Sequence, residues 1–427
     1  MKEIIKLKNP VKNYGWGTCD FIPNLLNVDN TEQKPFAELW MSTHKDGLSL
    51  AVSAVDDLAS GILTDVSDKS ASLAKIIKTD KEYFLGKKIA KKNDELPYLF
   101  KVLSAESPLS IQAHPNRKQA EAGFMRENAT AIPIDADERN YKDNNHKPEI
   151  MCALTNFQAM CGFRKLKEII YLLKMFDCPL TNKLMDARTL KSFFTTLFSL
   201  KNDGHLLNEY IEKNTEAIEK KFQRQKQIWE LIKKFNKVYP NDIAVIAPLY
   251  LNIINLKPRE AFFVPAGIMH AYVKGSGIEL MAACNNVLRG GLTSKYIDET
   301  ELCNVLIFKP YRPKIIACND EYETFLTYKT KAKDFVLSRL KNFCGSLPIK
   351  GPVIMIITNG NMLVTIKHLN KNLCRRAAGY FCSPEELHSV TNKTLELKTG
   401  ESIFIADKAP RKNIILKGNY TAFAAGV

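Results

Sequence analysis

The strongest constraint on the fold is a change of pattern along the chain, because strand-like runs at both ends flank a long helical middle. Between about residues 165 and 237, apolar residues recur every three or four positions, as in Ile228, Leu231, Ile232 and Phe235. This spacing is the period of one buried helix face. Pro240-Asn241-Asp242 then predicts a helix end. The sequence therefore predicts a helical segment inserted into a β protein.

Short apolar runs on either side of this segment are broken by Gly, Pro, Asn and Asp, which predicts strands and turns. Many short strands at regular spacing are typical of an antiparallel barrel or sandwich. A chain of 427 residues also exceeds one ordinary core. We expect a discontinuous strand-rich catalytic domain (1–155 and 242–312), a helical insertion (156–241) and a C-terminal β domain (313–427).

Composition narrows the protein class. The first residues lack the apolar core of a signal peptide, and no apolar stretch reaches the roughly 20 residues that cross a bilayer. The ten cysteines show no C-x-x-C spacing, which favours reduced thiols over disulfides or zinc fingers. These features predict a cytoplasmic protein that does not act on a membrane.

The formal net charge of +15 could attract nucleic acid, a membrane surface or an anionic metabolite. The sequence contains no zinc finger, RNA-binding signature or run of five basic residues. We therefore expect no nucleic-acid partner. A phosphorylated small molecule is compatible with the charge but is not identified by it.

Three segments predict a metal site. Ser110, Gln112 and His114 alternate along one predicted strand, so they share one face. Lys147 and Glu149 share a face of a second strand. A third strand ends in a Pro-Ala-Gly turn that could bring His270 to the same place. Two imidazoles, one carboxylate and one amide oxygen suit zinc, although Q-x-H alone is a common sequence.

At these residues the sequence resembles the type I mannose-6-phosphate isomerases, or phosphomannose isomerases. The resemblance covers most of residues 10–300 and is carried by several ordered motifs. They are Asn13-Tyr14-Gly15-Trp16-Gly17, Ala37-Glu38-Leu39-Trp40-Met41, residues 96–103 and 109–115, Asn145-His146-Lys147-Pro148-Glu149, residues 263–272 and residues 286–293.

The resemblance implies cupin-type (jelly-roll) β-barrels with a helical domain, and one Zn²⁺ per chain. It implies the ligands Gln112, His114, Glu149 and His270. The expected reaction interconverts mannose 6-phosphate and fructose 6-phosphate through an enediol, supplying mannose phosphate for GDP-mannose and glycan synthesis. We expect a monomer whose partner is the sugar phosphate.

The resemblance also places Lys101, Ser110, Lys147, Glu279 and Arg289 near the active site. Isomerisation moves a proton between C1 and C2, and Lys147 or Glu279 could carry it. A guanidinium binds phosphate through two donors, so Arg289 is the expected phosphate clamp. Lys101 and Ser110 are expected to bind substrate.

One motif departs from the family pattern. This chain has Cys284-Asn285-Asn286 where relatives usually have Ser-Asp-Asn, so an acid is missing at position 285. Three other classes stay open: a non-catalytic cupin that senses sugar phosphates, another metal enzyme such as a hydrolase or dioxygenase, and a nucleic-acid binder. An assay with mannose 6-phosphate, with and without a chelator, would separate them.

Overall fold

A computed structural model describes residues 3–52, 71–317, 323–368 and 391–427. The chain divides into two compact units. The first holds residues 1–12, 19–101 and 318–427, and the second holds residues 13–18 and 102–317. No helix among the described residues is long and apolar enough to span a bilayer.

The second unit is organised around one long strand, β11 (His270–Ala282). Its first half pairs with β8 (Phe157–Phe163) and, at His270, with β6 (Ile111–Ala113), whereas its second half pairs with β7 (Glu149–Ala153). Four further strands extend this antiparallel arrangement: β12 (Leu288–Gly291) beside β6, β10 (Ala261–Val264) beside β7, β9 (Leu251–Leu256) beside β8, and β5 (Tyr98–Ala105) beside β11. Only residues 102–105 of β5 belong to this unit. Strands that carry residues far apart in sequence thus meet along β11.

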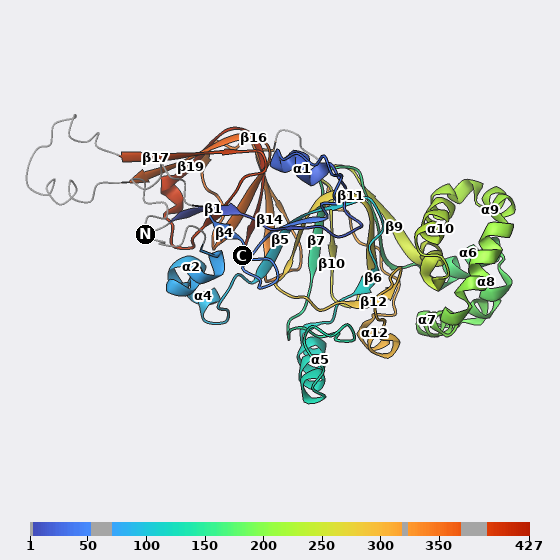
Figure 1. Cartoon of the computed structure of the whole chain (residues 1–427). Helices are drawn as coiled ribbons and strands as arrows, with labels where there is room; N and C mark the ends of the chain where they lie inside the picture. The colour runs from blue at the N-terminus through green and yellow to red at the C-terminus, as the bar shows by residue number, and fades with distance from the viewer. Residues whose placement is uncertain (1–2, 53–70, 318–322, 369–390) are drawn as a thin grey trace, which may run out of the picture. The chain divides into compact units, whose positions relative to one another are not determined.

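Helices of the second unit gather in the segment between β8 and β9 (Figure 1). The predicted apolar faces are buried there, since Ile169 and Phe176 of α6 and Ile228 and Phe235 of α10 are each at most 6% exposed. The α-helices are α6 (Leu166–Phe176), α7 (Leu190–Ser199), α8 (Gly204–Lys213), α9 (Thr215–Lys221), α10 (Lys226–Val238) and α11 (Ala247–Tyr250). The 3-10 helices are η2 (Pro179–Asp186), η3 (Lys201–Asp203), η4 (Gln223–Gln225) and η5 (Ile243–Ile246). The helix end predicted at Pro240 is confirmed, because α10 ends at Val238.

Two more helices lie in the second unit, α5 (Arg117–Ala129) after β6 and α12 (Glu299–Val305) after β12. Helix α5 begins with a capping box, in which the side chains of Asn116 and Gln119 each accept a hydrogen bond from the other residue's backbone N–H. The chain between α5 and β7, residues 130–148, then leads to the candidate site.

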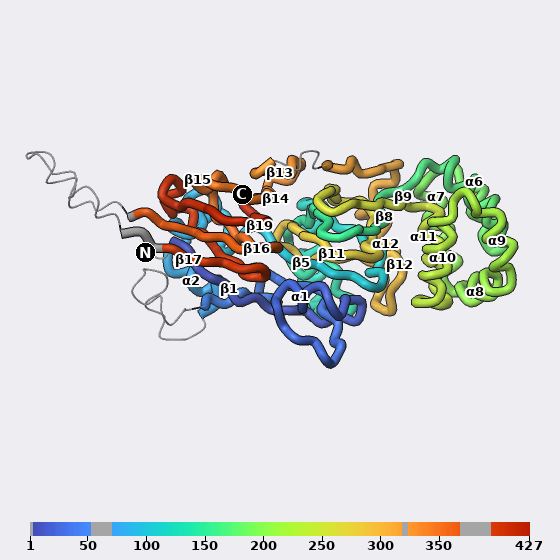
Figure 2. The backbone as a smooth tube through the Cα atoms, turned by 90° about the horizontal axis from the view of Figure 1, so that it is seen from above, coloured from blue at the N-terminus to red at the C-terminus, as the bar shows by residue number. Residues whose placement is uncertain are grey.

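The first unit contains a nine-stranded antiparallel sheet in which β16 (Val353–His368) lies beside β19 (Ile414–Gly426) (Figure 2). The N-terminal strand β1 (Ile4–Lys8) joins this sheet by pairing with β18 (Ser402–Ile405), a contact that local sequence patterns do not predict. The other strands of this sheet are β4 (Leu50–Ala51), β13 (Phe325–Tyr328), β14 (Val336–Lys341), β15 (Gly345–Ser346) and β17 (Thr391–Lys398). The remaining elements of this unit are β2 (Val11–Lys12), β3 (Glu38–Met41), α1 (Phe21–Leu26), α2 (Leu73–Thr79), α3 (Lys81–Leu85), α4 (Lys87–Ala90) and η7 (Arg411–Asn413).

The prediction of a mainly β fold with a helical insertion is confirmed. Among the described residues, the strand pairings leave both sheets open rather than closed into rings. The three domain limits and the cupin assignment stay predictions.

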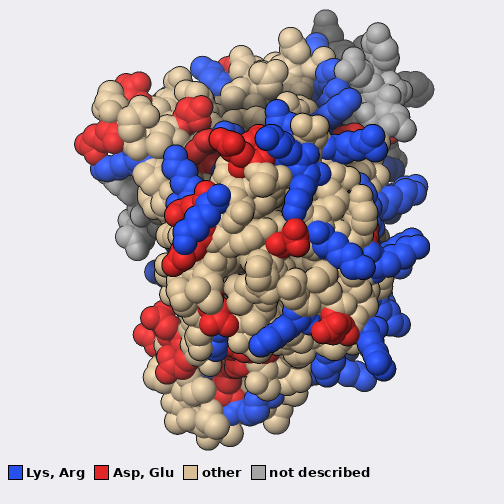
Figure 3. Space-filling view, turned by 90° about the vertical axis from the view of Figure 1, so that its right-hand side faces the viewer, with Lys and Arg blue, Asp and Glu red and all other residues tan. Residues whose placement is uncertain are grey.

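Lys and Arg are more frequent toward the right-hand edge of the face shown in Figure 3, where Asp and Glu also lie among them, so the surplus positive charge does not form one uniform patch. Several basic residues of the helical segment form ion pairs, for example Lys221 with Asp177 and Lys233 with Glu230. Basic side chains of the helical segment are thus partly neutralised by neighbouring acids.

Candidate metal centre

Strand register brings the predicted ligands together. On β6, the buried Ile111 and Ala113 face one side, and Gln112 faces the other. Gln112 lies directly opposite His270 across the β6–β11 pair, so both side chains project from the same face. On β7, Glu149 lies opposite Met281 of the same long strand.

Two imidazoles converge on one carboxylate. Nε2 of His114 lies 3.2 Å from Oε1 of Glu149, and Nε2 of His270 lies 3.2 Å from Oε2. All three side chains are at most 1% exposed, and their potential ligand atoms lie within 4.8 Å of one another. Such a cluster could hold a divalent metal ion.

The other nitrogen of each imidazole has a backbone partner. Nδ1 of His114 lies 2.8 Å from the carbonyl oxygen of Asn286, and Nδ1 of His270 lies 3.1 Å from that of Ile268. A carbonyl can only accept, so each Nδ1 carries the proton and leaves the Nε2 lone pair free. Both Nε2 atoms are buried, and neither has a hydrogen-bond partner among the described residues, which is the arrangement that a metal ion would complete.

The predicted turn before His270 is also present. Gly267 has a φ of +78°, and an added Cβ would lie 2.8 Å from Cγ1 of Ile307. The N–H of Gly267 donates to the carbonyl of His114 at 2.8 Å. This turn therefore requires glycine and joins the segments that carry the two histidines.

Charge within the site favours the protonation states that bind metal. Burial lowers the pKa of His114 to about 4, and the positive charge of Lys147 adds to this effect. Burial by itself would raise the pKa of Glu149, but the positive charge of Lys147, together with the two adjacent imidazoles, holds it well below its usual value. A neutral imidazole and an ionised carboxylate are the forms that a metal needs.

Two candidates for proton transfer lie close to Glu149. Nζ of Lys147 is 3.2 Å from Oε1 of Glu149, and Lys147 is 7% exposed. Glu279 is also buried and reaches Glu149 through a third residue, Tyr272. The Tyr272 hydroxyl donates to Oε2 of Glu149 at 3.2 Å and also hydrogen-bonds the Glu279 side chain. Tyr272 was not singled out from the sequence, although it lies two residues after His270 on the same strand face.

Arg289 lies opposite Gln112 across the β6–β12 pair and is half-buried. Burial lowers its pKa, and the charge of Asp137 opposes this effect. Lys295 is close enough to Arg289 that the charge of Arg289, together with partial burial and the charge of Lys142, lowers the pKa of Lys295. Arg289, Lys295 and Lys142 thus form a group of three basic side chains, of which sequence reasoning found only Arg289.

The two remaining candidates, Ser110 and Lys101, belong to different units. Ser110 is half-buried just before β6. Lys101 belongs to the first unit, where its Nζ lies 3.2 Å from Oε1 of Glu38 and 4.7 Å from the centre of a Trp40 ring. The indole N–H of Trp40 donates to the other oxygen of Glu38 at 2.8 Å. The motif Ala37-Glu38-Leu39-Trp40-Met41 therefore holds the Lys101 ammonium in place.

Comparisons with known proteins identify the family of the chain. Residues 4–166 match the family model of the phosphomannose isomerase type I catalytic domain. The mannose-6-phosphate isomerase of Escherichia coli is 41% identical over 302 residues, covering 70% of this chain and 73% of the relative. The chain belongs to the type I phosphomannose isomerase family. The human mannose-6-phosphate isomerase is 32% identical over 367 residues, covering 79% of this chain and 81% of the relative.

Solved phosphomannose isomerase structures extend the likeness to nearly the whole chain. The Salmonella typhimurium enzyme, bound to fructose 6-phosphate and zinc, gives a TM-score of 0.81 at 30% identity and covers 99% of both chains. A mannose 6-phosphate isomerase structure with zinc and yttrium gives the same values. The resemblance inferred from the motifs is thus confirmed.

Proposed function

We propose that the chain interconverts mannose 6-phosphate and fructose 6-phosphate at a zinc site formed by Gln112, His114, Glu149 and His270. The observation that carries this proposal is the buried His114–Glu149–His270 cluster, in which two unpartnered Nε2 atoms face one carboxylate. Gln112 is half-buried on the same face and could contribute its amide oxygen. Zinc accepts this mixed nitrogen and oxygen set and, when bound, supplies positive charge that stabilises sugar oxygens.

Proton transfer is the task of the residues around the metal. Isomerisation removes a proton from one carbon and returns it to its neighbour, so one group must act first as base and then as acid. We assign this role to Lys147, with Glu279 as the rival. Support for Lys147 comes from its burial and from the 3.2 Å distance to Glu149, which places an amine beside a metal ligand.

Phosphate recognition is assigned to Arg289. Its support is the neighbouring Lys295 and Lys142, because several positive groups together suit a dianionic phosphate. Arg289 is also opposite Gln112 in the strand register, so the phosphate and the reacting carbons would bind along the same sheet face. Lys101 and Ser110 are proposed as further substrate contacts.

The non-catalytic sugar-phosphate sensor is not favoured. A sensor needs the phosphate-binding groups but not a buried lysine beside a metal ligand. We further propose that the reaction takes place in the cytoplasm, that the protein acts as a monomer, and that its product supplies GDP-mannose and glycan synthesis. These last points rest on membership of the family.

The deciding experiment is an isomerisation assay on zinc-loaded protein with mannose 6-phosphate. Removal of zinc by a chelator should abolish activity, and added zinc should restore it. His270→Ala should lose both the metal and nearly all activity, since a neutral imidazole ligand is removed. His205→Ala, in the helical segment, is the matched control and should retain both. Full activity in a metal-free preparation would refute the zinc mechanism.

A further inference from the structure

The turn that precedes β7 is fastened by one buried side chain, Asn286. Its Oδ1 accepts hydrogen bonds from the backbone N–H groups of Lys142 at 2.8 Å and Asp143 at 3.1 Å. Its Nδ2 donates to the carbonyl oxygens of Asp143 at 2.8 Å and Asn145 at 2.9 Å. Asn286 is 0% exposed, so these bonds form without competition from solvent.

The carboxylate of Asp143 ties the same turn to the strand connection that carries Asn286. Its Oδ1 accepts from the backbone N–H of Asn145 at 2.8 Å and from Nδ2 of Asn286 at 3.2 Å. Its Oδ2 accepts from the backbone N–H of Asn285 at 2.7 Å. The two segments thus hold each other through side-chain and backbone groups.

Asn286 also touches the metal cluster, through its backbone. Its carbonyl oxygen is the 2.8 Å partner of Nδ1 of His114, a residue 172 positions away in sequence. This contact fixes the tautomer and the ring orientation that point Nε2 at Glu149. The position of that carbonyl depends on the backbone around Asn286, which the turn holds in place.

We propose that Asn286 is a positioning residue for the metal centre, acting through His114. Its side-chain amide holds the turn 142–146, and in return the turn keeps the Asn286 carbonyl in reach of the imidazole. The same turn runs directly into Lys147 and Glu149, so one amide sets the positions of groups from two strands. The inference rests on the proposed zinc site and assigns a residue that the site itself does not contain.

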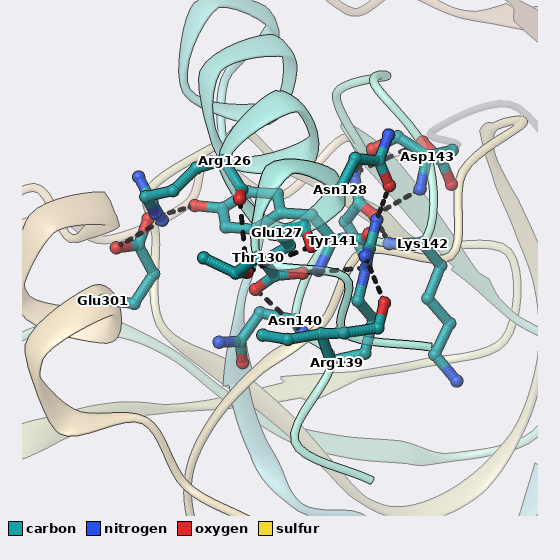
Figure 4. Close-up of polar contacts among 12 residues, drawn as sticks. Arg126, Glu127, Asn128, Thr130, Arg139, Asn140, Tyr141, Lys142, Asp143 and Glu301 are labelled. Carbon is teal, nitrogen blue, oxygen red and sulfur yellow. Dashed lines mark hydrogen bonds and ion pairs between the residues drawn. The ribbon is translucent and has the colours of Figure 1, made fainter. Parts of the chain in front are cut away.

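The hydrogen bonds of Asn286 form one clamp on the loop 130–148. A second clamp on the same loop provides a matched comparison (Figure 4). Nε of Arg139 lies 3.0 Å from Oε2 of Glu127, and the Glu127 carboxylate accepts from the backbone N–H groups of Asn140 at 3.2 Å and Tyr141 at 2.9 Å. These contacts fasten the loop to α5, whereas Asn286 fastens it to the segment that touches His114. Loss of either clamp should loosen the loop, but only loss of Asn286 should disturb the metal ligand.

The test measures zinc release directly. Wild type, Asn286→Ala and Glu127→Ala are loaded with one equivalent of zinc, and transfer of the metal to a chromophoric chelator is timed. Asn286→Ala should release zinc about 10-fold faster or more, the usual effect of removing a group that orients a metal ligand. Glu127→Ala should release zinc within about threefold of wild type, although its metal-free form should lose about as much thermal stability as that of Asn286→Ala.

Asn286→Asp covers the case in which the alanine variant does not fold. It keeps the size and the acceptor for Lys142 and Asp143, but puts an oxygen where Nδ2 meets the carbonyls of Asp143 and Asn145, so fast release is again expected. The double variant Asp143→Ala with Asn286→Ala should release zinc no faster than Asn286→Ala alone, because both substitutions remove the same clamp.

Zinc release from both Asn286 variants at the wild-type rate, or equal acceleration in Glu127→Ala, would overturn the positioning role. A wild-type protein that takes up no zinc would instead overturn the proposed function, so the two failures are distinguishable.

Discussion

Nζ of Lys147 lies 3.2 Å from Oε1 of Glu149, the oxygen that Nε2 of His114 also faces at the same distance. The ammonium of Lys147 and the imidazole of His114 therefore lie beside the same buried carboxylate oxygen. The carboxylate is ionised there because positive neighbours outweigh the cost of burial. This arrangement places an amine beside the carboxylate that we propose as a metal ligand.

Replacement of Lys147 by methionine removes the amine and keeps the length of the side chain. If Lys147 transfers the proton, kcat should fall by about 10²-fold or more, the usual contribution of a positioned acid or base. Zinc content, measured by metal analysis, should stay near one per chain because Glu149 and both histidines remain. An unchanged kcat would move the role to another group.

Glu279 is the next candidate, and its contacts predict a smaller effect. Its side chain hydrogen-bonds Tyr272, whose hydroxyl also donates to Glu149. We expect Glu279→Gln to reduce kcat less than Lys147→Met does. Tyr272→Phe should accelerate zinc release, since Glu149 loses a hydrogen-bond donor. A larger kcat loss in Glu279→Gln than in Lys147→Met would reverse the assignment.

Arg289 should contribute to binding of the phosphate rather than to the chemistry. Arg289→Ala should lower kcat/KM for mannose 6-phosphate by about 10²-fold, equivalent to about 3 kcal/mol. Arg289→Lys should mainly raise KM, because an ammonium lacks the planar pair of donors. With unphosphorylated mannose, wild type should react poorly and Arg289→Ala should be little worse. Equal losses on both sugars would assign Arg289 to the reacting carbons or to the fold.

We expect KM for mannose 6-phosphate to depend on pH because of Lys295. Partial burial and the charges of Arg289 and Lys142 lower its pKa, so its ammonium loses a proton at a lower pH than an ordinary lysine. A phosphate dianion favours the protonated form, so affinity is present below this pKa and is lost as the pH rises through it. KM for mannose 6-phosphate should therefore increase on the alkaline side. Lys295→Gln should show a higher KM at neutral pH and lack that alkaline increase, and a retained increase would exclude Lys295 as its source.

Much of the site could be predicted from local pattern. The alternation of Ser110, Gln112 and His114 predicts one shared face, and the turn at Gly267 predicts the approach of His270. Helical spacing in residues 165–237 likewise predicts α6 and α10, whose apolar faces are buried as expected. These features depend on residues within a few positions of one another, where backbone geometry alone fixes which side chains share a face.

Other features were decided by tertiary structure. The sequence places Asn286 only within a motif, and nothing local predicts that its carbonyl meets His114 or that its amide holds the turn at Asp143. Local sequence likewise does not predict that Lys295 lies near Arg289. Nor does it predict that β1 pairs with β18 near the other end of the chain. Such contacts join segments separated by long stretches of chain, and many alternative pairings have similar local propensities. Only the combined burial and hydrogen bonding of the whole fold selects among these pairings. The sequence alone therefore determined the types of the candidate ligands and the helices and strands that carry them. The tertiary structure decided which distant groups hold those residues in position.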